Sequence, residues 1–302
     1  MTEPCPRCQN LVTTAARRAI GSRGPVVLSA VRAPHLCGTC QARHLRPERY
    51  AVDLTSVLPA VLPDAAIRRG SLEVRREGVR ARVDFADMGL LRPQRLNPVR
   101  SSTSYKDKPN YSGFYWAATT GRHVWFESLY EKMALTALDR DPAVISFASQ
   151  PFEMIWASPR KSHFPDVLVE RDDRSLMLVD VRPRERIRSK DAETFGRTSA
   201  LCDLLDVDYR LFADLTAVQA FNLRFLAGYR FERWNCPPEI TDVLRRCVGE
   251  SRALRHWIPV FEGGLIPARG LLLAAIWHGV LEVDLSARLE MDRDALCTGS
   301  EW

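Results

Sequence analysis

The chain has 302 residues, enough for one large core or for two to three modest domains. Apolar residues make up 46% and charged residues 26%, as in ordinary globular proteins. Since it has no run of 18 apolar residues and no signal-peptide pattern, we expect a cytoplasmic protein with no membrane partner. The net charge is +6, but the chain up to Ser104 carries 17 Lys and Arg against 8 Asp and Glu. This basic front part indicates contact with phosphates, with a solvated basic face as the alternative.

The first 50 residues hold two short cysteine pairs, Cys5-Pro-Arg-Cys8 and Cys37-Gly-Thr-Cys40. Four thiolates at this spacing predict one tetrahedral Zn²⁺ in a zinc-ribbon-like module over residues 1–50. Fourfold sulfur ligation leaves no open position, so this zinc is expected to be structural. Four ordinary thiols are the alternative. The other four cysteines are scattered. Three of them, Cys202, Cys236 and Cys247, are predicted to be buried thiols, and the fourth is Cys297.

Residues 51–104 are predicted to be a connecting region with a strand-like stretch over 72–74, and residues 105–214 an α/β core with a mixed sheet. Apolar positions at three- and four-residue spacing predict a helix over 124–138. Alternating apolar patterns and turn signals predict the remaining elements of the core. These are strands over 144–147, 152–156, 166–169, 176–181 and 209–212, and a helix over 192–205.

The last segment, residues 215–302, is expected to be mainly helical. Helices are predicted over 238–248 and 268–278, and a short closing strand over 280–285. A helix followed directly by a β-ribbon is compatible with a small winged-helix-like unit.

Two aspartates and an arginine are predicted to meet at one end of a β-hairpin. If the strands over 166–169 and 176–181 pair as a hairpin centred near Asp173, Asp166 lies opposite Asp180, with Cβ atoms about 4.5–5.5 Å apart. Arg182 shares the face of Asp180, about 7 Å along the strand. Glu127, on the preceding predicted helix, can supply a third carboxylate.

Adjacent buried carboxylates repel each other unless a cation joins them. Mg²⁺, or Mn²⁺ in its place, suits such an oxygen site and can activate water against a phosphodiester. Each residue taken alone has an ordinary explanation: Glu127 as a solvated helix residue, Asp166 as a strand-start cap, and Asp180 with Arg182 as a surface ion pair. Their joint geometry therefore carries the prediction.

The order Glu, then Pro-Asp, then Asp-x-Arg resembles the PD-(D/E)xK nuclease superfamily, whose restriction-endonuclease-like core is an α/β mixed sheet. The surrounding motifs make the chain similar to the TnsA-like heteromeric transposase endonuclease subunits over about residues 105–285. The motifs are Tyr111-Ser-Gly-Phe-Tyr-Trp-Ala-Ala-Thr-Thr-Gly, Phe126-Glu-Ser, Ser149-Gln-Pro-Phe, His163-Phe-Pro-Asp, Val179-Asp-Val-Arg-Pro and Asn222-Leu-Arg-Phe-Leu-Ala-Gly-Tyr.

The resemblance implies a Mg²⁺-dependent enzyme that cuts the 5′ strands at transposon ends. It places Glu127, Asp166 and Asp180 at the acidic metal-site positions and Arg182 at the position of the active-site lysine. The implied partners are transposon-end DNA, an integrase-like transposase subunit and an ATPase regulator, with partner contacts in residues 215–302.

Arg182 departs from the family pattern, because an arginine stays charged in proteins and cannot act as a general base. If the site needs only a fixed cation, Arg182 can serve. Otherwise the chain is a non-catalytic DNA-binding adaptor with a degenerate nuclease fold. A stand-alone defence or repair nuclease is a further alternative. Gln150, Arg17 and Arg18 are candidate DNA contacts, and His163 is expected to be a supporting or surface residue.

Overall fold

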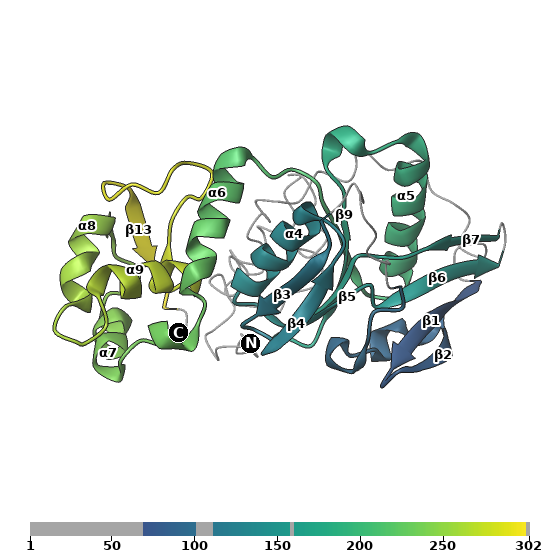
Figure 1. The fold of residues 1–302 in the computed structure, drawn as a ribbon, viewed down its shortest axis with the longest axis horizontal. Coiled ribbons are helices and arrows are strands. Elements are labelled where there is room, and N and C mark those ends of the chain that lie inside the picture. Colours follow the sequence, from purple (N-terminus) through teal and green to yellow (C-terminus); the bar gives the residue numbers. More distant parts are fainter. Residues whose placement is uncertain (1–68, 101–110, 158–159, 300–302) are drawn as a thin grey trace, which may run out of the picture. The chain divides into compact units, whose positions relative to one another are not determined.

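The computed structural model describes residues 69–100, 111–157 and 160–299. These residues form a mixed α/β fold with antiparallel and mixed sheets, which confirms the predicted α/β class (Figure 1). The chain divides into two compact units, each assembled from two stretches of sequence. Of the described residues, unit 1 contains 69–100, 150–157 and 160–214, and unit 2 contains 111–149 and 215–299. No helix among the described residues has the length and apolarity needed to cross a bilayer.

The first sheet of unit 1 is antiparallel throughout, with the strand order β2-β1-β6-β7. Leu72 and Val74 of β1 are fully buried, as are Phe152 and Met154 of β6, so one face of this sheet is core. The strand-like stretch over 72–74 thus belongs to a sheet strand that pairs with the predicted strand over 152–156. The strands are β1 (Gly70–Arg76), β2 (Val79–Asp84), β6 (Phe152–Ala157) and β7 (Arg160–His163).

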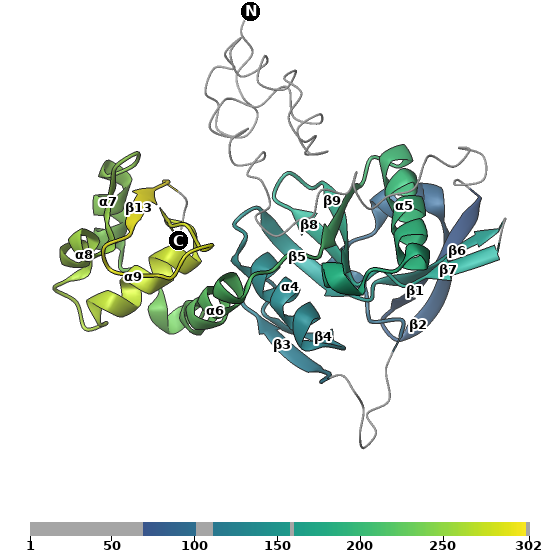
Figure 2. The same cartoon turned by 90° about the horizontal axis from the view of Figure 1, so that it is seen from above.

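The second group of strands in unit 1 contains the predicted hairpin. β8 pairs antiparallel with β9, and β9 pairs parallel with β10. The parallel pair is possible because a 16-residue helix, α5, connects the two strands (Figures 1 and 2). The predicted elements are confirmed with small shifts of their ends: β8 (Val167–Arg171), β9 (Leu176–Val181), α5 (Ser189–Leu204) and β10 (Asp208–Phe212).

Unit 2 begins with a hairpin and a helix, where the prediction of one helix over 124–138 is wrong at its start. Residues 122–126 form a strand whose Val124 and Phe126 are buried beside α4, while their neighbours face outward. The helix begins only after Ser128, whose hydroxyl accepts from Glu131 N–H. β-branched and aromatic residues favour the strand, and the N-cap fixes the helix start. The elements are β3 (Gly113–Ala117), β4 (Arg122–Phe126), α4 (Leu129–Arg140) and β5 (Val144–Ser149).

The C-terminal part of unit 2 is mainly helical around a small antiparallel sheet with the order β11-β13-β12 (Figures 1 and 2). The predicted strand over 280–285 is shorter than expected, because Asp284 turns the chain by accepting from Ser286 N–H at 2.9 Å. The elements are α6 (Ala217–Leu226), α7 (Pro238–Arg246), β11 (Ser251–Ala253), α8 (Leu254–Trp257), α9 (Ala268–Trp277), β12 (Leu281–Glu282) and β13 (Asp294–Cys297).

Short 3-10 helices complete both units. Those of unit 1 are η3 (Phe85–Leu90), η4 (Pro93–Arg95) and η5 (Arg184–Arg186), and those of unit 2 are η6 (Ala227–Tyr229), η7 (Glu232–Trp234) and η8 (Ile258–Phe261).

Candidate active site

The two predicted aspartates meet at one end of the β8–β9 hairpin. Val167 pairs with Val179, so the hairpin is centred at position 173 and Asp166 falls opposite Asp180 one residue further. The backbone N–H of Val181 donates to Oδ2 of Asp166 at 2.6 Å. The predicted register is therefore confirmed, although Asp166 lies just before the first residue of β8.

Asp180 is almost fully buried, with 1% of its surface exposed, and two side chains hold it. Nε2 of His163, on β7, lies 2.9 Å from each carboxylate oxygen. The hydroxyl of Tyr209, on β10, donates to Oδ2 at 2.6 Å. Burial, followed by the charge of Asp180, raises the pKa of Tyr209 well above its usual value, so this hydroxyl remains a donor.

The supporting role that was one of the two predictions for His163 agrees with its contact to Asp180, whereas the role of Tyr209 was not predicted from the sequence. His163 lies on β7 and Tyr209 on β10, so different strands bring them to Asp180. The one local signal for Tyr209 is a phenol within the buried strand Asp208–Phe212, where a buried hydroxyl needs a partner.

Arg182 is bound to the first turn of α5. Its Nη2 lies 3.2 Å from Oδ2 of Asp191, and Arg188 binds the same carboxylate at 3.2 Å. Burial alone would raise the pKa of Asp191, but hydrogen bonds from Arg188 and the charges of Arg182 and Arg188 together lower it. The buried Nε of Arg182 has no acceptor among the described residues, so this donor is left unsatisfied.

Gln150 is a strained, buried neighbour of Asp166. Its φ is +44°, a left-handed conformation that a residue other than glycine rarely adopts, and 4% of its surface is exposed. Its N–H donates to the carbonyl oxygen of Asp166 at 2.7 Å. Its side-chain oxygen finds no hydrogen-bond partner in the described part of the chain. Strain and an unsatisfied polar atom together are typical of functional positions.

Glu127 does not lie on a helix, contrary to the prediction. It occupies the bend between β4 and α4, and its N–H donates to Oε2 of Glu131 at 2.8 Å. It belongs to unit 2, whereas Asp166 and Asp180 belong to unit 1. A metal-binding role for Glu127 therefore stays a prediction.

The side chains near Asp166 offer oxygen atoms, the kind of ligand that a hard divalent cation takes. The described residues contain no group of three or more His, Cys, Asp or Glu side chains that could hold a metal ion. Mg²⁺ needs only one or two carboxylates when water and phosphate complete its shell. Asp166 and Asp180 supply two carboxylates. A carboxylate has about four lone-pair positions, so Oδ1 of Asp180 can bind a cation in addition to its contact with His163. The side-chain oxygen of Gln150, which has no hydrogen-bond partner among the described residues, is a third possible oxygen ligand.

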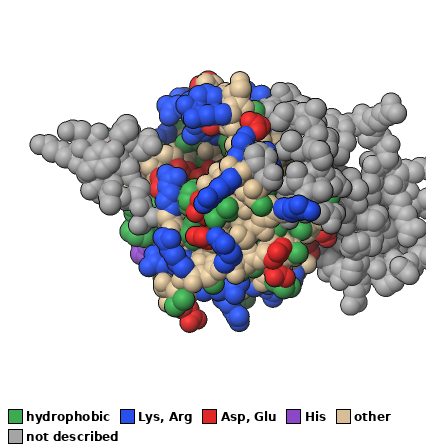
Figure 3. All heavy atoms as spheres, turned by 90° about the vertical axis from the view of Figure 1, so that its right-hand side faces the viewer, with side chains coloured by type: hydrophobic (Ala, Val, Ile, Leu, Met, Phe, Trp, Pro, Cys, Tyr) green, Lys and Arg blue, Asp and Glu red, His purple; other side chains and the backbone are tan. Residues whose placement is uncertain are grey.

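A basic segment follows Arg182 directly. Its exposed cations are Arg184, Arg186, Arg188 and Lys190, of which Arg184 pairs with Asp214 at 2.7 Å. Figure 3 shows one side of unit 1, where Lys and Arg side chains gather in several places with acidic side chains between them. Comparing net charges over long stretches of the sequence missed this basic segment, because the chain after Ser104 as a whole carries more acidic than basic residues.

The predicted zinc ligands Cys5, Cys8, Cys37 and Cys40, together with Arg17 and Arg18, lie outside the described residues. Of the three cysteines predicted to be buried, Cys202 is buried, whereas Cys236 and Cys247 are only half-buried, so that prediction is wrong for two of them. Cys297 is buried.

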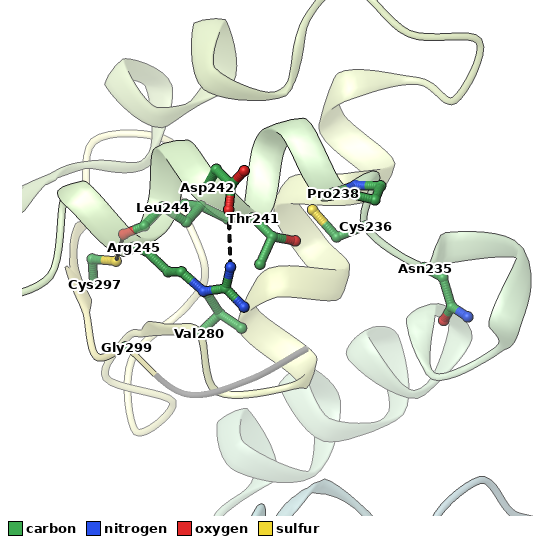
Figure 4. Close-up of a pocket in the computed structure, with 10 residues that line it drawn as sticks. All are labelled: Asn235, Cys236, Pro238, Thr241, Asp242, Leu244, Arg245, Val280, Cys297 and Gly299. Carbon is green, nitrogen blue, oxygen red and sulfur yellow. Dashed lines mark hydrogen bonds and ion pairs between the residues drawn. The ribbon is translucent and has the colours of Figure 1, made fainter.

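A cavity of about 540 Å³ lies in the C-terminal part of unit 2, lined by Cys236, Arg245, Val280 and Cys297 among others (Figure 4). Burial raises the pKa of both thiols, which disfavours the reactive thiolate form. Arg245 pairs with Asp242 at 2.9 Å. This cavity therefore lacks an activated nucleophile among its described residues.

No protein-family model matches the chain, and no curated protein matches it significantly. The chain is therefore described by its own architecture, an α/β fold in which the buried Asp180 lies opposite the half-buried Asp166.

Proposed function

We propose that this chain is a metal-dependent DNA endonuclease subunit of a heteromeric transposase, with a restriction-endonuclease-like core. The observation that carries the proposal is the position of Asp166 opposite Asp180, at the end of a hairpin that leads into the basic segment 182–190. Paired carboxylates beside clustered cations suit hydrolysis of a phosphodiester bond, because the carboxylates hold a metal and the cations hold the DNA backbone.

Asp166, Asp180 and Gln150 would hold the cation, and Glu127 stays a candidate ligand. A bound Mg²⁺ would lower the pKa of a water and stabilise charge on the scissile phosphate. His163 and Tyr209 keep the Asp180 carboxylate fixed by donating to it. A ligand whose position is fixed before the cation binds loses less conformational entropy on binding.

Arg182 would serve as a fixed cation. Its Nε donor is buried and has no partner among the described residues, and its terminal nitrogen is tied to Asp191. A guanidinium held on one side can direct its remaining donors at a phosphate oxygen. The exposed Arg186 and Lys190 would contact neighbouring phosphates.

The C-terminal part of unit 2 would be a winged-helix-like unit that contacts the partner subunits. The order α7-β11-α8-η8-α9-β12-β13, with the sheet order β11-β13-β12, is compatible with a winged helix and supports this part of the proposal. Helix α9 takes the place of the groove-reading helix, yet every residue over 270–277 is buried. A helix without an exposed polar face cannot read bases in the major groove, which favours protein contact over DNA reading in this region.

The N-terminal zinc module is proposed as well. The ligands would be Cys5, Cys8, Cys37 and Cys40, and about one zinc ion per chain should stay bound through purification. Metal analysis of reduced, folded protein tests this, and a zinc content near zero removes the module from the proposal.

The test of the nuclease uses full-length protein with the integrase-like transposase, the ATPase regulator, Mg²⁺ or Mn²⁺ and labelled end DNA. We expect 5′-strand cleavage, lost by at least about a hundredfold in Asp166→Asn and Asp180→Asn. Asp172→Asn is the matched control, since Asp172 is exposed in the turn at the opposite end of the hairpin. Arg182→Lys should keep activity and Arg182→Ala should lose it.

A non-catalytic DNA-binding adaptor is the second candidate. The arginine at position 182 favours it, because a guanidinium stays charged and cannot replace a general base. If the chain and Arg182→Lys both fail to cleave with all partners supplied, while DNA binding persists, the adaptor replaces the nuclease. Cleavage without any partner would instead indicate a stand-alone nuclease.

A further inference from the structure

The outer face of the β3–β4 hairpin is aromatic. Phe114 and Trp116 alternate on β3 with buried residues, and His123 and Trp125 do the same on β4. Phe114 is 65% exposed and Trp116 38% exposed. We call these four side chains the ribbon face. A cluster of exposed rings is unusual on a folded protein and typically marks a binding surface.

The rings of the ribbon face support one another across the two strands. Phe114 pairs with Trp125 in the strand register, and their ring centroids are 5.0 Å apart. Trp116 pairs with His123, with centroids 5.1 Å apart. Phe114 and Trp116 are two residues apart on one strand, which places them about 7 Å apart. The ribbon face is therefore a preformed platform with rings at regular intervals.

Asp139 holds the inner side of this hairpin rigid. Its carboxylate accepts from the Tyr115 hydroxyl at 2.8 Å and from Thr119 N–H at 2.8 Å, in the connection between the strands. The backbone that carries these rings is therefore already ordered, and little conformational entropy is lost when a ligand stacks on the ribbon face.

The exposed charges near the ribbon face are positive, whereas the half-buried Arg230 is paired with the buried Asp139 at 4.0 Å. Residues 111–126 contain no Asp or Glu, whereas Arg122 and His123 are exposed at the start of β4. Nε of Arg230 donates to the carbonyl oxygen of Trp116 at 3.2 Å, at the edge of β3. Its guanidinium also lies 4.2 Å from the ring centre of Phe231, which Arg233 covers from 5.5 Å. Aromatic rings interleaved with arginines match a polyanion that carries flat bases.

We propose that the ribbon face binds an unpaired nucleic-acid strand by base stacking, with the exposed Arg122 and Arg233 near its phosphates. Bases stack on exposed rings without needing a pocket, whereas a partner protein that used these rings as anchors would fill pockets around them. Stacking is independent of base identity, so the surface recognises single strands in general. The proposal goes beyond the nuclease site and needs no metal, because the ribbon face lies in unit 2 and the facing carboxylates lie in unit 1.

The experiment measures binding of fluorescent dT12 to the full-length protein in EDTA, beside a blunt duplex of the same length. The double variant Phe114→Leu, Trp116→Leu should bind dT12 about tenfold more weakly or worse, since each stacked base contributes about 1–3 kcal/mol. Its affinity for the blunt duplex should change by less than about twofold. Leucine keeps the apolar character of the face, and Trp116→Tyr should restore most of the affinity because it restores a ring.

Two matched controls separate this proposal from other effects. Phe221→Leu removes an aromatic ring that is 57% exposed on α6, outside the ribbon face, and should leave dT12 binding unchanged. Asp172→Asn, at an exposed position in unit 1, should also leave it unchanged. The measurement needs no cleavage, so failure of the nuclease proposal is distinguishable from failure of this one. Equal binding of dT12 by the double variant and the unaltered chain overturns the proposal. So does a loss of self-association on sedimentation without a loss of strand binding, which would assign the face to a second copy of the chain.

Discussion

Two buried aspartates, one in each unit, show how differently a carboxylate can be used. Asp139 in unit 2 accepts from Tyr115 and from the backbone N–H groups of Ala118 and Thr119, at 2.8–3.1 Å. Asp180 in unit 1 is held by two side chains, His163 and Tyr209, and faces a second carboxylate.

The difference lies in what the folded state gains from each charge. The bonds of Asp139 tie the β3–β4 connection to α4, and such charge-assisted bonds to backbone stabilise the fold. The pairing of Asp180 with Asp166 brings like charges together, which costs stability in the absence of a cation. We therefore assign a structural role to Asp139, whose carboxylate accepts hydrogen bonds from the backbone. Asp180, whose carboxylate faces a second carboxylate, is a candidate for function.

The largest effect on stability is expected from Asp139→Ala. The change leaves two backbone donors and the Tyr115 hydroxyl without their acceptor, which should lower the free energy of unfolding by about 3–5 kcal/mol. Asp180→Asn should change it by about 1 kcal/mol or less, because the relief of repulsion with Asp166 offsets the weakened hydrogen bonds. Urea unfolding of both variants tests the comparison, and a larger loss for Asp180→Asn would reverse our assignment of the two roles.

A pH-dependent loss of stability is expected from His278, at the end of α9. Burial lowers its pKa to about 4; the charge of Arg140 acts in the same direction and that of Asp139 opposes it. Between pH 6.5 and 4 the unfolded chain binds a proton that the folded chain does not. The stability contributed by neutral His278 is complete above pH 6.5 and falls by about 3 kcal/mol on acidification to pH 4.

Urea unfolding at pH 7.5, 6 and 5 measures this loss. His278→Gln should flatten the pH dependence, whereas His256→Gln, at an exposed position, should leave it as it is. An unchanged slope in His278→Gln would show that other groups cause the acid sensitivity.

A smaller effect is expected from Ser128→Ala, at the start of the helix that carries Asp139. Loss of the N-cap should cost about 1 kcal/mol, while Ser128→Asp should be nearly neutral. Thermal unfolding gives the difference. If Ser128→Ala were neutral, the helix would not begin where the cap places it.

The smallest effect on stability is expected in the basic segment of unit 1. Arg186→Gln and Lys190→Gln should change the free energy of unfolding by less than about 0.5 kcal/mol, since both side chains are exposed. Each should reduce the slope of log affinity for duplex DNA against log salt by about 1 if it contacts a phosphate. Slopes that stay the same would remove these residues from the DNA-binding surface.

The sequence by itself predicted much of the local structure. Alternating apolar residues located the strands of the core, and the turn at Asp172-Asp173 fixed the register that sets Asp166 opposite Asp180. The register of a hairpin can be predicted because it depends on its own turn and on the hydrophobic pattern of its two strands, which are close together in the sequence. Where two local patterns competed, as over Val124–Phe126, the sequence was misread, since apolar spacing in a short run fits both a helix and a strand.

Only the tertiary structure decided which side chains surround Asp180. His163 and Tyr209 come from two other strands, and the parallel pairing of β9 with β10 that brings Tyr209 near depends on the crossover through α5. Tertiary structure also decided the partner of Arg182, since Asp191 lies on α5. The backbone strain at Gln150 likewise cannot be predicted from residue composition or from hydrophobic periodicity. Contacts between elements depend on how whole elements pack, and a linear pattern encodes only the face that each element buries.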